Sequence, residues 1–177
     1  EGTAYDLNIK MFNKMQQTIT GWPGGKPNAD DTYRPERSTP EKKRVIIFSP
    51  HPDDDVISMG GTFDRLVEQG HEVHIAYQTS GNIAVSNEEA LKFAEISKAL
   101  NPDSAVSDEI VDFLQNRTGN EIDSPEVRKL KGLIRRSESF GATRYIGLPD
   151  SNVNFLDLPF YETGTVKKNN LSDADID

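Results

Sequence analysis

The fold is decided by residues 44–66, which read RVIIFSPHPDDDVISMGGTFDRL. An apolar run over residues 45–48 stops abruptly, and His51 and three successive aspartates, residues 53–55, follow it. The short apolar run predicts a buried strand, and the pattern after it predicts a helix over residues 55–70. Adjacent carboxylates repel one another, so this cluster needs a nearby positive charge, either a metal cation or the N-terminus of the following helix.

The rest of the chain alternates predicted strands with predicted helices. Three of the later segments have helical spacing, and two of these begin at a serine that suits the capping position. The predicted strands are 44–49, 71–80 and 143–148, and the predicted helices are 55–70, 86–100, 107–117 and 124–142. This alternation is typical of an α/β fold with a parallel sheet, in which ligands bind beyond the C-terminal ends of the strands. The histidine and the aspartates lie at that edge.

Residues 1–43 differ from the remainder in pattern. Residues 5–19 place apolar side chains at helical spacing, whereas residues 20–43 are rich in proline, glycine and charge. We expect this helix and linker to be the tail of an upstream domain, and residues 44–177 to form a single α/β domain.

Composition excludes several classes of function. The 177 residues carry a net charge of −9 and no cysteine. A nucleic-acid-binding domain normally has a basic face, so we expect no nucleic-acid partner. Without cysteine the chain has no disulfide and no thiolate metal ligand. No apolar run is long enough to span a membrane and no signal peptide is visible, so we expect no membrane partner and a cytoplasmic location.

Metal binding is the chemistry that the cluster after the first strand suits. A neutral imidazole and a carboxylate are good ligands for zinc or another divalent cation. Prolines fix the loop, and the spacing of His51 and Asp54 allows both side chains to converge on one ion. Asp53 is then the candidate general base toward a water molecule. The alternative is structural, because aspartates commonly cap helices and His51 could be a turn residue.

The motif PHPDDD, a helix that carries GG and a following strand that ends in TSG together resemble the LmbE/PIG-L family. The resemblance covers roughly residues 44–152 and implies a Rossmann-like three-layer sandwich with a parallel sheet, incomplete at its C-terminus. It also implies metal-dependent removal of the N-acetyl group from N-acetylglucosamine-type sugars. By this resemblance His51 and Asp54 are zinc ligands and Asp53 is the general base, while Asp55 stands where the family usually has glutamate.

A second segment, RRSESFGATRYIGLPDSN over residues 135–152, is similar to the family's R-x-x-E segment and the sugar-contacting loop after it. This similarity implies an amino-sugar substrate that is bound by Arg135 or Arg136 and by Asp150. Without the resemblance, the two arginines are ordinary solvated helix residues. Asp150 follows the third predicted strand, on the edge where His51 is expected.

The metal site is incomplete in this sequence. A catalytic zinc usually has three protein ligands, and the family takes its third from a later histidine motif, but no histidine follows His74. We expect His71 at the surface and His74 as a packed or surface residue, both too early in their strand to reach His51. We therefore expect a truncated domain that binds metal weakly, if at all, and does not catalyse alone.

Two alternatives stay open. Paired acids after a first strand also form magnesium-dependent phosphoryl sites, although such a site leaves the histidine unexplained. The chain also resembles bacterial proteins in which an LmbE-like domain follows a glucosamine-6-phosphate deaminase/isomerase-like domain, which implies a non-catalytic module. The expected partners are an upstream domain or a second copy of the chain, because an incomplete sheet exposes an unpaired edge and an apolar face.

Overall fold

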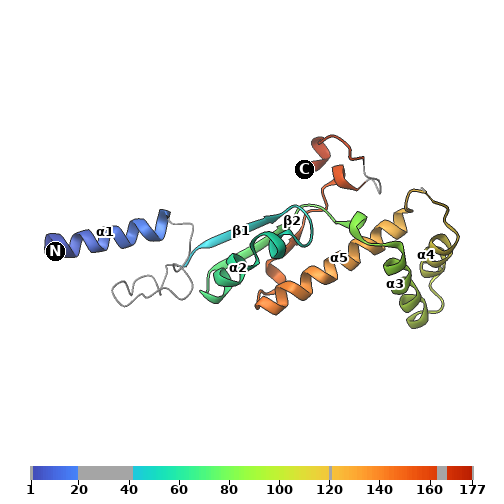
Figure 1. The fold of residues 1–177 in the computed structure, drawn as a ribbon, viewed down its shortest axis with the longest axis horizontal. Helices are drawn as coiled ribbons and strands as arrows, with labels where there is room; N and C mark the ends of the chain where they lie inside the picture. Colours follow the sequence, from blue (N-terminus) through green and yellow to red (C-terminus); the bar gives the residue numbers. More distant parts are fainter. Residues whose placement is uncertain (1, 20–41, 120, 163–166, 177) are drawn as a thin grey trace.

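The computed structural model describes residues 2–19, 42–119, 121–162 and 167–176. Figure 1 shows an elongated molecule with helix α1 (Ala4–Ile19) at one end, a sheet in the middle and a group of helices at the other end. The mixed α/β architecture with a parallel sheet confirms the fold class that the sequence predicts.

The sheet contains three parallel strands, all within the described residues. They are β1 (Arg44–Ser49), β2 (Glu72–Tyr77) and β3 (Val153–Phe155), in the spatial order β1-β2-β3. Ser49 pairs with Tyr77 and Tyr77 with Phe155, so the carboxyl ends of the strands coincide. The loops that leave β1 and β2 therefore meet at one edge of the sheet, where ligand sites of such folds form.

The predicted third strand over residues 143–148 is wrong. Helix α5 (Pro125–Ile146) continues through most of it and ends at Gly147, whose φ of 88° lies in the left-handed region that favours glycine. The strand that completes the sheet is β3, six residues after that helix cap. It has three residues with an asparagine at the centre, which is a weak strand pattern.

Helix α2 (Asp54–Glu68) covers one face of the sheet. Its buried Phe63 and Leu66 pack in a core cluster with Leu148 and with the inward side chains of β1 and β2, which are Ile47, Val73, Ile75 and Tyr77. The opposite face of β1 carries Ile46 and Phe48, whose residues are 59% and 61% exposed. The described residues thus bury one face of the sheet and leave an apolar strip on the other.

A second core lies among the helices. Helices α3 (Asn87–Leu100) and α4 (Ala105–Asn116) pack against the first half of α5, close to the predicted ranges. Each helix begins after a capping serine whose hydroxyl oxygen accepts a hydrogen bond from a backbone N–H in the first turn. These serines are Ser86, Ser104 and Ser124. The buried members of this core are Val85, Ala90, Ala94, Ile110, Val111, Leu114, Val127 and Ile134.

The N-terminal helix predicted over residues 5–19 is present as α1, whereas most of the predicted linker lies outside the described residues. Figure 1 shows α1 projecting away from the sheet. Tyr5, Leu7 and Met11 are exposed on it. The division into an upstream tail and a following domain stays a prediction. No helix in the described ranges is long and apolar enough to cross a membrane.

Candidate active site

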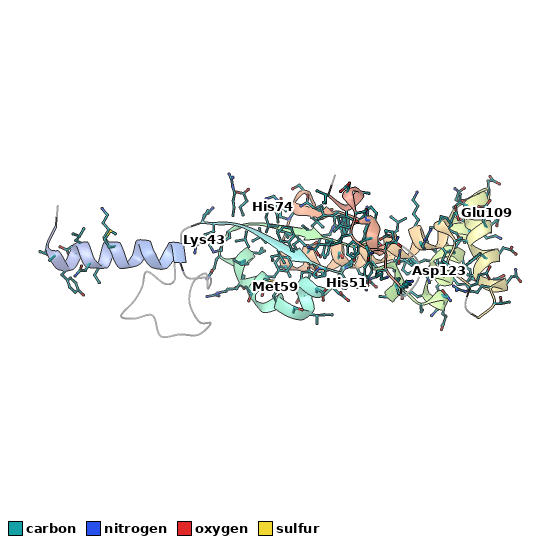
Figure 2. The ribbon with its side chains drawn as sticks, turned by 90° about the horizontal axis from the view of Figure 1, so that it is seen from above. Lys43, His51, Met59, His74, Glu109 and Asp123 are labelled. Carbon is teal, nitrogen blue, oxygen red and sulfur yellow. The ribbon has the colours of Figure 1, made fainter. Side chains whose placement is uncertain are left out.

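The candidate site lies on the loop between β1 and α2, at the carboxyl edge of the sheet. Figure 2 places His51 in the middle of the molecule, between the start of β1 near Lys43 and the helices near Asp123. The backbone amide of Asp53 donates to the carbonyl oxygen of His51 at 2.8 Å, which closes a tight turn. The Ser49 hydroxyl donates to the same carbonyl at 2.6 Å. The loop is thereby fixed to the last residue of β1.

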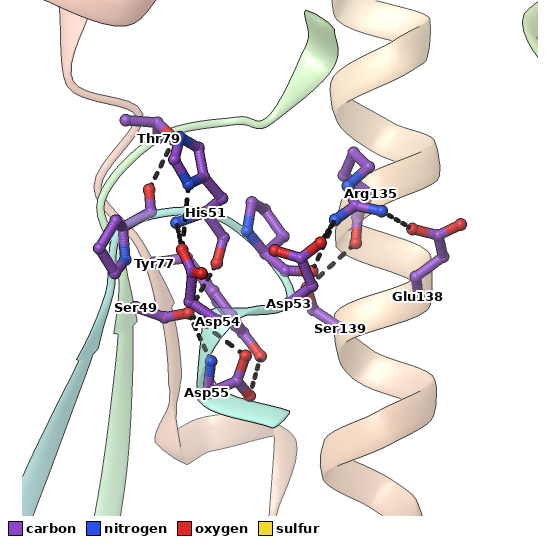
Figure 3. Close-up of polar contacts among 12 residues, drawn as sticks. Ser49, His51, Asp53, Asp54, Asp55, Tyr77, Thr79, Arg135, Glu138 and Ser139 are labelled. Carbon is purple, nitrogen blue, oxygen red and sulfur yellow. Dashed lines mark hydrogen bonds and ion pairs between the residues drawn. The ribbon is translucent and has the colours of Figure 1, made fainter. Parts of the chain in front are cut away.

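His51 and Asp54 come together as the sequence predicts. The imidazole Nδ1 of His51 lies 3.0 Å from Oδ2 of Asp54, and the backbone N–H of His51 donates to that oxygen at 3.0 Å. Figure 3 shows the two side chains facing each other. They are 40% and 33% exposed, so a cation from solvent can reach this pair.

Asp53 faces away from this pair and toward helix α5. Its Oδ2 lies 2.8 Å from Nη2 of Arg135, and Figure 3 shows Arg135 reaching the loop from α5. The same guanidinium donates to the carbonyl oxygen of Pro52 at 3.1 Å and contacts Glu138 at 2.6 Å. Arg135 therefore contacts the candidate base, and its predicted role in substrate binding stays a prediction.

Asp55 serves the fold. It is 1% exposed, it accepts a hydrogen bond from the Tyr77 hydroxyl at 2.8 Å, and its backbone N–H donates to the Ser49 hydroxyl oxygen at 3.0 Å. Burial raises the pKa of the Tyr77 phenol well above its usual range, and the charge of Asp55 adds to that rise. Tyr77 consequently stays protonated and remains a donor to Asp55. The three adjacent aspartates thus have three separate partners, which offsets their mutual repulsion.

The segment TSG after β2 supports the loop. The Thr79 hydroxyl donates to the carbonyl oxygen of Pro50 at 2.7 Å. Gly81 has a φ of +67°, and a Cβ there would lie 2.7 Å from Cδ of Pro52. Glycine is needed at this position both for its backbone conformation and for the close approach of the proline ring. The sequence motif is therefore explained by contacts with the histidine loop.

Two residues of the site carry no signal in the sequence. The Tyr161 hydroxyl lies 2.9 Å from Nε2 of His51, and the next residue, Glu162, accepts hydrogen bonds from Asn82 Nδ2 at 2.8 Å and from the backbone N–H of Ser80 at 3.3 Å. Both belong to a stretch that the sequence pattern predicts as loop. Only the folded chain brings them to the site, because they are 110 and 80 residues away from their partners in sequence.

The two other predicted substrate residues have ion-pair partners of their own. Arg136 forms an ion pair with Asp157, and its guanidinium lies 4.7 Å from the ring centroid of Phe155. Asp150 accepts from Arg144 at 2.9 and 2.6 Å. The expected position of Asp150 is wrong, because it precedes β3 and so lies at the amino end of the strands. The cause is the mistaken third strand, which placed it after a strand end.

The remaining histidines do not join the site. His71 is 7% exposed, so its expected place at the surface is wrong. Its Nδ1 accepts from the backbone N–H of Lys43 at 3.0 Å, at the amino end of β2. Burial, followed by the charge of Lys43, lowers the pKa of His71. His74 is partly exposed and its Nε2 lies 3.5 Å from Glu72.

Two described residues of the loop have side chains of the kinds that metal sites use. His51 and Asp54 are donors of the types that zinc and similar cations take. A catalytic zinc usually has three protein ligands, and among the described residues no three His, Cys, Asp or Glu side chains form a group that could hold a metal ion. A complete site would need a donor from outside this set.

Comparison with known proteins agrees with the sequence motif. The family model for PIG-L, GlcNAc-PI de-N-acetylase, matches residues 46–176. This chain belongs to the PIG-L family. The LmbE/PIG-L resemblance seen in the PHPDDD motif is therefore confirmed, and PIG-L membership indicates a deacetylase-type hydrolase.

A longer relative extends this comparison. A glucosamine-6-phosphate deaminase-like protein of Bacteroides thetaiotaomicron is 57% identical over 185 residues, which cover 99% of this PIG-L chain and 28% of that protein. The chain thus spans less than a third of the relative's length. The resemblance to glucosamine-6-phosphate deaminase-like proteins is confirmed as a similarity. No solved structure matches the chain.

Proposed function

We propose that this PIG-L chain forms part of a metal-dependent hydrolase that removes the N-acetyl group from an N-acetylglucosamine-type sugar. The observation that supports it best is the pairing of His51 with Asp54 at 3.0 Å beside Asp53, at the edge where such folds bind ligands. Family membership supports the same reaction. A cytoplasmic location and an amino-sugar substrate are parts of this proposal.

His51 and Asp54 would hold the metal, which when bound would polarise the acetyl carbonyl and lower the pKa of a water molecule. Asp53 is the proposed base. Its Oδ2 is engaged by Arg135, so Oδ1 is the oxygen left to take the proton from water. The side chain is 41% exposed, which permits water to reach it.

We propose that His51, Asp54 and Asp53 do not catalyse the reaction until a third protein side chain completes the coordination of the metal. The test is acetate release from N-acetylglucosamine with added zinc, measured for this chain and for the complete natural polypeptide. The proposal expects release by the complete polypeptide, its loss in the Asp53→Asn variant, and none from this chain alone. Absence of release by the complete polypeptide under all zinc conditions would contradict the proposed reaction.

A second candidate is a non-catalytic module within a glucosamine-6-phosphate deaminase-like protein. The relative's name and the 28% of its length that the chain covers favour this candidate. Unaltered deamination after His51→Ala, together with no acetate release by the wild-type protein, would support it. A magnesium-dependent phosphoryl site has less support, because magnesium prefers oxygen ligands and His51 lies at the centre of the loop.

A further inference from the structure

A groove of about 420 Å³ lies along helix α5. On α5 its lining residues recur every three or four positions, so they share one face of the helix. They are Pro125, Arg128, Lys129, Gly132, Leu133 and Arg136. The other wall consists of Ser80, Asp157 and Glu162. The groove is therefore bounded by α5 on one side, and by Ser80 and the segment that follows β3 on the other.

Two polar contacts fasten the walls together. Nη1 of Arg128 donates to the backbone carbonyl oxygen of Glu162 at 3.1 Å, and Arg136 forms an ion pair with Asp157. Asp157 has a φ of 48°, a left-handed conformation that is uncommon for residues other than glycine. The ion pair with Arg136 joins this segment to α5.

The groove is cationic in a chain whose net charge is −9. The carboxylate of Asp157 is engaged by Arg136, and that of Glu162 accepts from Asn82 and from the backbone of Ser80. Arg128 makes its hydrogen bond to a neutral carbonyl. Within the described ranges, no carboxylate forms an ion pair with Arg128 or Lys129. Two positive charges therefore remain for a ligand.

The groove adjoins the candidate active site along two segments. Tyr161 contacts His51, and the next residue, Glu162, lines the groove. Arg135 holds Asp53, and the next residue, Arg136, lines the groove. A molecule placed with its amide at Asp53 would thus have the groove beside it.

We propose that Arg128 and Lys129 bind an anionic group of the phosphate class, carried by the same amino-sugar molecule whose acetyl group lies at Asp53. This inference rests on the proposed function for the identity of the sugar. A guanidinium and an ammonium together suit phosphate oxygens, since the first offers a planar pair of donors and the second a point charge. A carboxylate on the sugar is the competing ligand of similar charge.

The experiment follows backbone amide NMR signals of the full 177-residue chain during titration. The probes are inorganic phosphate, N-acetylglucosamine and N-acetylglucosamine 6-phosphate. We expect the amides of Ser80 and Gly132 to shift with both phosphate compounds, and the 6-phosphate to bind about tenfold more tightly than the neutral sugar, or ~1.4 kcal/mol. Lys129→Glu should remove that advantage. Lys10→Glu makes the same charge change on α1, away from the groove, and should leave it unaltered.

The inference is overturned if the groove amides do not respond to phosphate, or if the two lysine variants weaken binding equally. Tighter binding of N-acetylmuramic acid, a carboxylate sugar, than of the 6-phosphate would contradict the phosphate class. Failure of the proposed function is seen separately, as absent acetate release from the complete polypeptide. The NMR titration does not depend on acetate release, so the two failures can be told apart.

Discussion

Arg135 on α5 contacts Asp53 on the loop after β1. Its Nη2 lies 2.8 Å from the carboxylate of Asp53 and 3.1 Å from the carbonyl oxygen of Pro52. The guanidinium side chain is only 14% exposed, so its position is set by packing on α5. Arg135, one of the two arginines that the family resemblance implies for substrate binding, thus contacts the candidate base. Mutation of residues that orient the groups of a metal site, without touching the metal, typically costs about 10- to 100-fold in activity.

We predict that Arg135→Ala lowers kcat for acetate release by the complete polypeptide about 10- to 100-fold, with little change in KM, because Asp53 loses its fixed orientation. Arg135→Lys should restore part of the rate. Arg144→Ala removes an exposed arginine paired with Asp150 at the far end of the strands, and it should not alter the rate. A rise in KM with kcat unchanged would instead indicate that Arg135 binds substrate.

Tyr77→Phe is predicted to lower the free energy of unfolding by about 1–3 kcal/mol, because the buried carboxylate of Asp55 loses its closest side-chain donor. Urea denaturation of both proteins measures the difference. Tyr145 is 93% exposed, so Tyr145→Phe is the matched control and should change stability by less than ~0.5 kcal/mol. Equal effects of the two substitutions would show that the hydrogen bond to Asp55 does not stabilise the fold.

The stability of the fold is predicted to fall as the pH drops below the ordinary histidine pKa of about 6.5, because of His71. Its pKa is lowered in the folded state, so the unfolded chain binds the proton more readily, and acid favours unfolding. Above that pH the contribution is fully present. Protonation of Nδ1 would also abolish its hydrogen bond from Lys43.

Urea unfolding at pH 7.5 and 5.5 measures this dependence. His71→Asn places an amide oxygen near the position of Nδ1 and removes the titration, so the variant should lose less stability between the two pH values than the wild type. His74→Asn, at a partly exposed position, should keep the wild-type dependence. An identical pH dependence in His71→Asn would contradict the assignment to His71.

The bare apolar face of β1 is predicted to drive self-association of the chain. Ile46 and Phe48 are exposed on a strand that lies at the edge of the described sheet. Substitution of both by threonine should shift the mass measured by light scattering toward the monomer. Leu100→Thr, at a position 82% exposed at the end of α3, is the control. A monomeric wild-type chain would rule out this role for the β1 face.

Local patterns predicted much of this architecture. The apolar run of β1, the alternation in β2 and the serine caps of α3 and α5 each depend on residues close together in sequence, and the structure confirms those elements. The pairing of His51 with Asp54 was predictable for the same reason, since three positions on a tight loop bring the two side chains together.

The failures share a physical cause, which is distance along the chain. The end of α5 contains residues that suit a strand, but its helix continues until Gly147. The short strand β3 forms through its pairing with β2, and its own sequence does not predict that pairing. Tyr161 contacts His51 although the two residues are 110 positions apart in sequence. The position of Asp150 was wrong because the segment before it was predicted as a strand. Contacts of this range depend on the assembled sheet.

Zinc titration by calorimetry tests most directly whether His51 and Asp54 are metal ligands. The wild-type chain should bind zinc weakly, with a Kd of about a micromolar or higher, because two protein ligands are fewer than a catalytic zinc site usually has. Binding should be lost in His51→Ala and kept in His74→Ala. Zinc binding that is unaltered by His51→Ala, or that is lost equally in His74→Ala, would contradict the assignment.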